Sequence, residues 1–358
     1  MIGVVLSVTV AAAGYAVLAS SEKSVTANQQ TVETQQNVRI AMDFLFQDIR
    51  QAGFGMTGAV GLCPTAIVPA DNTKTGPDFG PDRISIVVPL GNPVGTPSDP
   101  AWILNSDTSS GFNTIALPSA AVLTNMQTAA GNLATQSISI GGAVTTTVVS
   151  ASGGSLTVAP VPAPISMKRN SPVYVLQCVT YQIIPPPDPT NLCEGRSPCL
   201  VRGVAGAMTA GVLDCTTAGS TCRNIADEIE DIQFAYACDG CVAAINSGAP
   251  DDIIDNQGGA IGFDQADFVT NNGWATAPMT ADTIRLVQVT LVGRQRSSDQ
   301  GFGESNRTTV QSAALQVSDH LHSDGVFASG DFATLNPSYT STRRRLLTRT
   351  IELRNLRH

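Results

Sequence analysis

The N-terminal segment constrains the fold of this chain most, because it predicts one helix of about 50 residues. Residues 1–19, MIGVVLSVTVAAAGYAVLA, carry no charge, and an α-helix needs roughly 20 apolar residues to cross a bilayer. Residues 20–36 are polar but contain neither Gly nor Pro, so nothing in them ends the helix. At the standard rise the whole helix would be roughly 75 Å long, and few globular domains contain such an element.

The last turns of this helix have the pattern of a segment that packs on a domain. Apolar side chains in residues 37–55 recur at steps of three and four, which gathers them on one helical face: Val38, Ala41, Phe44, Leu45, Ile49 and Ala52. Gly53 and Gly55 follow, which suits a left-handed helix end. We therefore predict a stalk helix over residues 1–55, with residues 1–19 as its transmembrane half.

A secretory signal peptide is the competing interpretation of residues 1–19. Val17, Leu18 and Ala19 resemble a small-residue cleavage site. A basic n-region is missing, however, and the predicted helix continues past the supposed cut. Membrane insertion is therefore the leading interpretation.

Composition indicates that the remaining residues, 56–358, form a β-rich head. Only 14% of the residues are charged, and the chain contains 32 Gly and 21 Pro, which is typical of many turns and short strands. We expect strands at residues 84–90, 143–152, 155–161, 172–184, 229–237, 283–293 and 344–355, because β-branched residues alternate there between turn signals. In the last strand Leu347, Ile351 and Leu353 should point inward, with Arg349 interrupting the pattern. The fold class is therefore α+β.

Two regions of the head are predicted differently. Residues 225–232, IADEIEDI, are expected to form a short helix before the following strand. Residues 70–150 are expected to be elaborated β structure or long loops, because they contain no helix signal.

Eight cysteines lie beyond the apolar segment, and an even count there fits disulfides formed in an oxidising compartment. Proximity in sequence suggests three pairs and leaves a fourth: Cys193–Cys199, Cys215–Cys222, Cys238–Cys241 and Cys63–Cys178. The C-x-x-C at Cys238 is interpreted as a structural disulfide, although redox activity and a metal site are the alternatives. The motif is not followed by His, which excludes c-type haem attachment.

Three further clusters of polar residues are candidate sites. Four acids share one loop and are candidate calcium ligands, although solvated loop acids are the preferred interpretation: Asp239, Asp251, Asp252 and Asp255. His320 and His322 would share one strand face as a metal half-site, which we discount. The C-terminal arginines are interpreted as a solvated face paired to local acids, the alternative being an anionic partner: Arg343, Arg344, Arg345, Arg349, Arg354 and Arg357.

Catalysis is not expected. G-x-S-x-G, a P-loop and a dinucleotide fingerprint are all absent from the sequence. The net charge of −9 argues against broad binding of nucleic acid. We expect no cofactor, calcium being the one ion with a candidate site.

Three separated segments together resemble the type IV prepilin-like proteins, and most closely the PilW-type minor pilins. The first is the apolar opening with its polar continuation and the end RIAMDFLFQDIRQAGFG. The second is IADEIEDIQFAYACDG, at residues 225–240, and the third is ADTIRLVQVTLVGRQR, at residues 281–296, with RRRLLTRTIELRN at residues 343–355. These segments cover roughly a third of the chain.

One departure from the family concerns the N-terminus. The family has a basic leader, a Gly before the cleaved bond and a Glu ahead of the apolar run, and Met1 stands where the family has residues just after that Glu. Our hypothesis is that the natural protein begins upstream of Met1, which translation of the upstream DNA would test.

The resemblance implies a structural minor pilin, held in the inner membrane and then extracted into an extracellular pilus filament. The size of the head suggests a tip or priming position, and the family implies methylation and a role in cell adhesion. Implied partners are other pilins and minor pilins, with a tip adhesin as a further candidate. The residues implied to pack in membrane and helix bundle are Val4, Val5, Leu6, Val8 and Val10, and those implied to dock the head are Phe44, Leu45 and Ile49.

Two alternative functions remain open. A type II secretion pseudopilin of the J kind shares the predicted architecture. A secreted or anchored β-rich binding protein or hydrolase, with residues 1–19 as signal peptide, is the alternative from a different class.

Overall fold

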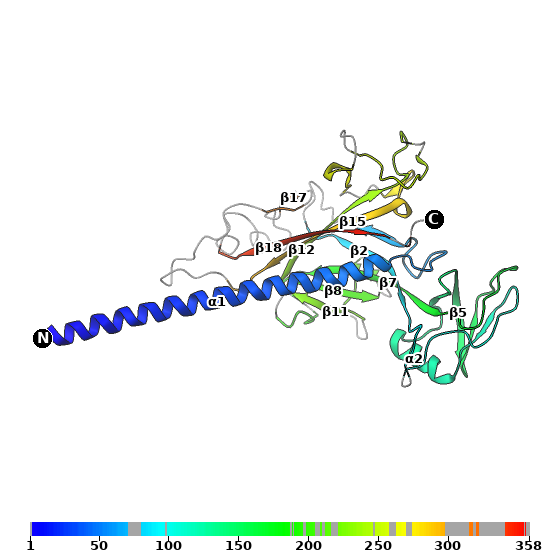
Figure 1. Cartoon of the computed structure of the whole chain (residues 1–358), viewed down its shortest axis with the longest axis horizontal. Coiled ribbons are helices and arrows are strands. Elements are labelled where there is room, and N and C mark those ends of the chain that lie inside the picture. The colour runs from blue at the N-terminus through cyan, green and yellow to red at the C-terminus, as the bar shows by residue number, and fades with distance from the viewer. Residues whose placement is uncertain are drawn as a thin grey trace.

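The protein is a long helix that carries a β-rich head around its C-terminal third, as a computed structural model shows (Figure 1). The structure describes residues 2–70, 80–96, 99–186, 188, 190–195, 198–204, 208–209, 212–215, 221–245, 248–257, 263–269, 274–297, 315–317, 320–321, 341–353 and 355. The N-terminal part of the helix projects away from the head, which gathers at the other end. The α+β fold class predicted from the sequence is confirmed.

Helix α1 spans Ile2–Gln51, as one uninterrupted element. Its buried residues begin only at Thr34, so most of its length does not touch the head. Gly53 follows the helix with a φ of 74°, a left-handed conformation that a side chain disfavours. The helix end predicted from the glycines is therefore confirmed.

The larger sheet has nine antiparallel strands, the first of which, β1, begins at Ile67. Its order is β1-β2-β7-β4-β5-β6-β3, and off this path β8 pairs with β7 and β11 pairs with β8. The long strand β7 is central, because it pairs with β2, β4 and β8. The strands are β1 Ile67–Ala70, β2 Arg83–Leu90, β3 Thr114–Ala116, β4 Ser137–Ile140, β5 Val144–Ser152, β6 Ser155–Val158, β7 Val173–Ile184, β8 Cys199–Val204 and β11 Arg223–Asp227.

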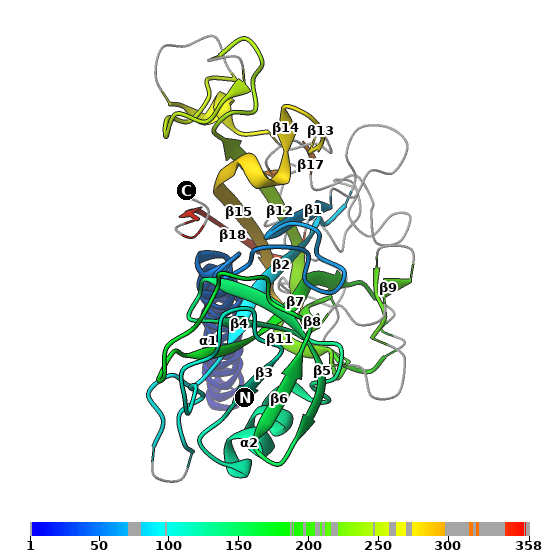
Figure 2. The ribbon, with the colours of Figure 1, turned by 90° about the vertical axis from the view of Figure 1, so that its right-hand side faces the viewer.

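A second, three-stranded antiparallel sheet lies against the helix. Over the described residues its order is β12-β15-β18, which places β18 at one end of the sheet (Figure 2). The strands are β12 Ile229–Cys238, β15 Ile284–Arg294 and β18 Arg344–Glu352. Short elements complete the described part of the head: β9 Met208–Thr209, β10 Val212–Leu213, η2 Gln265–Asp267, β13 Ala275–Thr276, β14 Met279–Thr280, η3 Ala281–Thr283, β16 Gln316–Val317 and β17 His320–Leu321.

Two large hydrophobic cores divide the head. The first joins the last turns of α1 to both sheets and includes Leu45, Tyr181, Phe234 and Val289. The second lies around α2, Ala120–Ala130, and strands β3 to β6. Figure 1 shows the α2 lobe at the end of the head away from the free part of the stalk. The first core therefore fixes the position of the head on the stalk.

The structure corrects three sequence-based expectations. Residues 225–232 are not a helix but the end of β11 and the start of β12, separated by Glu228 at a φ of 56°. Residues 70–150 do contain a helix, α2, which follows Ser119 and buries Val122, Leu123 and Met126 at helical spacing. Leu347 is not inward, since 37% of it is exposed, although Ile351 and Leu353 are buried.

Candidate interaction surface

The N-terminal half of α1 is an exposed apolar surface. Val4, Val5, Leu6, Val8 and Val10 are all exposed, and consecutive residues point in different directions around a helix. Within the described part of the chain, α1 is the one helix long and apolar enough to cross a membrane, and none of its most apolar window is buried. A helix that is apolar on every side requires an apolar environment that the head does not provide.

Two hydroxyl groups of this apolar half, those of Ser7 and Thr9, are bonded within the helix itself. Ser7 Oγ donates to the carbonyl of Val4 at 2.9 Å, and Thr9 Oγ1 donates to the carbonyl of Leu6 at 2.9 Å. A free hydroxyl in hydrocarbon would cost several kcal/mol. The hydroxyls of Ser7 and Thr9 therefore do not prevent this segment from lying in an apolar medium.

A second exposed stripe continues along the outer side of the stalk. Ile40 and Phe44, one turn apart, are 45% and 46% exposed. At about 100° per residue they point away from Leu45 and Ile49, which are completely buried. Val25 and Val32 are exposed further down α1 and line a shallow groove on the helix surface. The stalk therefore has one face on the head and an opposite face open to another molecule.

Of the three residues expected to dock the head, the structure places two in the core and one on the surface. Leu45 and Ile49 lie in the first core, whereas Phe44 points outward, so the expectation for Phe44 was wrong. Phe46 packs against the core instead, and the guanidinium of Arg349 lies over its ring at 3.7 Å. A cation over an aromatic face is stabilising. The signal in the sequence was Arg349 itself, which interrupts the apolar pattern of β18.

A polar contact ties the last turns of α1 to the larger sheet. The hydroxyl of Tyr181, in β7, donates to Asp48 Oδ2 at 2.7 Å, and Arg202 Nε, in β8, donates to the same oxygen at 2.7 Å. Burial raises the pKa of Tyr181 above its ordinary value, and the negative charge of Asp48 raises it further. The tyrosine therefore stays a neutral donor. Sequence reasoning missed this contact, because its partners are 133 and 154 residues away from Asp48.

Strand β15 approaches α1 closely at one point. Added to Gly293, a Cβ would overlap Cγ2 of Val38 and lie 3.3 Å from Cγ2 of Thr34. Thr34 Oγ1 also donates to the carbonyl of Arg294 at 3.3 Å. The absence of a side chain at Gly293 thus lets the strand lie directly against the helix.

All eight cysteines are paired, in the four pairs that sequence proximity suggested. Cys63–Cys178 links the segment after the stalk to β7 across 115 residues of sequence. Cys238 and Cys241 lie in the first core and are buried. Since reaction with a partner thiol requires access to the sulfur, the geometry fits a structural disulfide.

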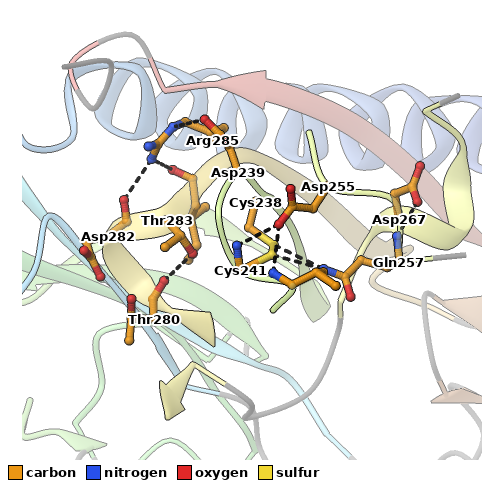
Figure 3. The surroundings of a disulfide bond; sticks show 12 residues. Cys238, Asp239, Cys241, Asp255, Gln257, Asp267, Thr280, Asp282, Thr283 and Arg285 are labelled. Carbon is orange, nitrogen blue, oxygen red and sulfur yellow. Dashed lines mark hydrogen bonds and ion pairs between the residues drawn. A yellow bond between two sulfur atoms is a disulfide. The ribbon is translucent and has the colours of Figure 1, made fainter. Parts of the chain in front are cut away.

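Acidic side chains hold the loop around this C-x-x-C, as Figure 3 shows. Asp255 Oδ2 accepts from the backbone N–H groups of Cys241 and Val242, at 2.7 and 2.8 Å. Asp239 accepts from the backbone N–H groups of Asp251 and Asp252, at 2.9 and 3.1 Å. Asp239 and Asp255 are buried and therefore serve as caps of the loop backbone rather than as the solvated acids expected from the sequence.

The described residues contain no group of three or more His, Cys, Asp or Glu side chains placed to hold a metal ion. Of the four calcium candidates, Asp239 and Asp255 make the backbone contacts described above. His320 begins β17, and His322 lies outside the described residues.

The C-terminal arginines are only partly the solvated face expected from the sequence. Arg343 and Arg345 are exposed. Arg344 instead forms a buried two-point ion pair with Glu230, at 2.6 and 3.1 Å, in which the side chains are 2% and 0% exposed. Arg349 lies 3.6 Å from Asp43 of α1. Arg354 and Arg357 lie outside the described residues.

Comparison with protein families gives a match over part of the chain. The profile of the family Type IV Pilus-assembly protein W, PilW, matches residues 194–355. That region contains the whole three-stranded sheet that packs on the stalk. Comparisons with curated proteins and with solved structures gave no match.

Proposed function

We propose, from the premise that residues 194–355 are those of a PilW-type pilus-assembly protein, that the chain is a minor pilin. It is inserted in the inner membrane through residues 1–19 and then extracted into a type IV pilus filament. The head remains outside the membrane throughout. The observation that carries this proposal is the exposed apolar half of α1, which is continuous with a head that covers none of it.

The surfaces of the stalk support both proposed stages, insertion in the membrane and packing in the filament. Val4, Val5, Leu6, Val8 and Val10 are exposed to an apolar medium, which is lipid before assembly and neighbouring stalks afterwards. Higher along the helix, Ile40 and Phe44 provide apolar contacts on the side opposite the head. Packing of helices against one another through such apolar stripes is stabilising, because it buries the stripes. The partners are therefore other pilin and minor pilin subunits.

The dimensions of the head support a position at or near the filament tip, where the minor pilin takes part in priming of assembly. The stalk is buried on only one face, yet the head contains two cores and a lobe around α2 that extends beyond the end of the helix. A head of this size in every shaft subunit would oppose close packing of the stalks. The same geometry fits a type II secretion pseudopilin of the J kind, which is the second candidate.

The continuity of α1 favours this function over a secreted protein with a cleaved signal peptide. The helix passes Ser20 without a break and stays helical to Gln51. Among the described residues, the acids near the C-x-x-C bond backbone groups of their own loop. The head is accordingly proposed to act as a structural subunit rather than as an enzyme.

The test is to express the complete gene in its own host and to analyse sheared pili by mass spectrometry. We expect the chain in the filament fraction at a small fraction of the major subunit. Leu6→Asp should abolish incorporation, because it places a charge in the apolar half, while Leu6→Ile should retain it. A mature N-terminus at Ser20 in the secreted fraction would overturn the proposal. Normal pili with defective protein secretion in the deletion strain would favour the pseudopilin.

A further inference from the structure

We propose that the outer edge of β18 is a docking site for an extended, acidic peptide segment of a partner protein, which adds a fourth strand to the three-stranded sheet. β18 spans Arg344–Glu352 and pairs with β15 in one continuous register without a bulge. Within the described part of the chain it has no second strand neighbour, and β15 lies on only one side of it in Figure 2. The edge itself does not depend on the proposed function. The identification of the partner as a neighbouring filament subunit, in contrast, rests on the proposed function.

Alternate backbone groups of β18 point away from β15. The N–H of Gln295 donates to the carbonyl of Arg343, and the N–H of Leu353 donates to the carbonyl of Arg285. In an antiparallel pair these bonds recur at every second residue, so Arg345, Leu347, Arg349 and Ile351 also bond to β15. The N–H and C=O groups of Leu346, Thr348 and Thr350 therefore face outward, and no described residue pairs with them.

The opposite edge of the same sheet is closed, which shows that this fold does cover edges. On β12, the carbonyl of Ile232 accepts from the N–H of Asp82 at 2.8 Å, and the N–H of Phe234 donates to the Asp82 carboxylate at 2.8 Å. Tyr236 forms a bridge to Val269 through both of its backbone groups, at 2.8 and 2.9 Å. An exposed, regular edge is a template for pairing with another strand. Among the described residues, β18 therefore differs from β12 in having no group that covers its outer edge.

Charge indicates which strand fits this edge. The arginines that β18 exposes are Arg345 and Arg349, and Glu352 is its one acid, so the exposed side chains of the strand are more basic than a chain with a net charge of −9. Arg345 and Arg349 are exposed on the face of the sheet toward α1, with Leu347 between them, and Leu346 is exposed on the other face. Glutamates at alternate positions of an added strand would lie beside the arginines.

A second copy of β18 is a poor occupant for the same reason. Pairing of two such edges would bring Arg345 and Arg349 of one copy beside those of the other, and like charges on neighbouring strands are destabilising. The arginines thus prevent self-association without closing the edge to an acidic strand. The ligand is accordingly an acidic, β-forming segment of a different chain.

The experiment uses the full-length protein in detergent and an eight-residue fluorescent peptide that alternates Glu and Val. Binding is measured by anisotropy, and amide hydrogen exchange reports the contact at Leu346, Thr348 and Thr350. We expect saturable binding that weakens with salt, slower exchange at those three amides, and no binding of a peptide that alternates Lys and Val. A fully N-methylated Glu–Val peptide, which has no backbone donors, should also fail to bind.

A matched pair of variants tests the edge itself. Thr348→Pro removes an outward N–H without removing a bond to β15, and we expect affinity for the Glu–Val peptide to fall about tenfold or more. Thr348→Val loses the same side-chain contact with Thr290 but keeps the N–H, so its affinity should stay within about twofold. Arg345→Glu should weaken the Glu–Val peptide and strengthen the Lys–Val peptide.

Three results would overturn the proposal. The first is that the N-methylated peptide binds as tightly as the Glu–Val peptide, because a peptide without backbone donors cannot form the hydrogen bonds of a strand pair. Tight binding of a single-stranded oligonucleotide that Thr348→Pro leaves unchanged would show a charge surface instead of a strand acceptor. Unchanged exchange at Leu346, Thr348 and Thr350 on binding would place the contact elsewhere. If Thr348→Pro is not folded, the N-methylated peptide still decides the question.

Discussion

Gly293 lies so close to Val38 that a methyl group on its Cα would overlap the valine side chain. The contact joins the central strand of the three-stranded sheet to α1 at the level where the stalk enters the head. Because Gly293 is not in the left-handed region, alanine there is disfavoured only by the shortage of space. A substitution at Gly293 therefore tests the packing of the head on the stalk without adding backbone strain.

Gly293→Ala should destabilise the head. Since either the strand or the helix must move to admit the methyl group, we expect a loss of about 1–3 kcal/mol in the free energy of unfolding. Urea unfolding of the full-length protein in detergent measures it. Gly58→Ala is the control, because no atom lies within 4 Å of a Cβ there. Val38→Ala combined with Gly293→Ala should recover part of the loss, and equal losses for both glycine variants would contradict the packing argument.

Asp48→Asn should weaken the attachment of α1 to the larger sheet. The variant removes the charge that Arg202 faces and replaces one acceptor of two strong hydrogen bonds, so we expect a loss of about 1–3 kcal/mol in stability. Asp43→Asn is the matched control on the same helix. Its carboxylate is 66% exposed and lies 3.6 Å from Arg349, a geometry worth less than about 1 kcal/mol. A larger loss for Asp43→Asn than for Asp48→Asn would refute this assignment.

Alkaline pH should destabilise the protein through Tyr181. Its pKa is raised in the folded state by burial and by Asp48, so above the unfolded value, near 10, the folded protein binds more protons than the unfolded one. Stability contributed by this group is complete below about pH 10 and decreases as the pH rises above it. Chemical unfolding at several alkaline pH values measures the slope. Tyr181→Phe should flatten it, and an unchanged slope would assign the effect to other groups.

The disulfides should differ in their contribution to stability. Cys63–Cys178 spans 115 residues and Cys193–Cys199 spans only 6. On chain entropy alone, the double serine variant of the first pair should lose about 5 kcal/mol, and that of the second about 2 kcal/mol. Thermal unfolding of the two variants compares them. The same loss for both would show that loop length does not decide the effect here.

Features that the sequence encodes locally were predictable. The helix end at Gly53 and the strands β2, β7, β12 and β15 follow from periodicity and turn residues, which act within a few positions. The disulfides were suggested because three of the pairs lie within 7 residues of each other. Local signals of this kind do not require knowledge of the sheet order.

Features that depend on the sheet order were not predictable. Residues 225–232 have acids at helical spacing, yet Glu230 lies in β12 because Arg344, 114 residues later, neutralises it in the interior. Phe44 belongs to the apolar stripe by spacing, but the sheets cover only the side of α1 that carries Leu45 and Ile49. The position of β18 at the end of its sheet, among the described strands, likewise depends on the order of the strands.

The hydroxyl bonds of Ser7 and Thr9 have a consequence for movement of the stalk between environments. Both donors are bonded to carbonyls of their own helix, so neither hydroxyl must exchange a partner when its surroundings change from one apolar medium to another. For these two residues, the free-energy difference between two such media then depends on van der Waals contacts and on the freedom of the surrounding molecules. Small differences of that kind allow transfer in either direction, as withdrawal of a stalk and its return to the bilayer would require.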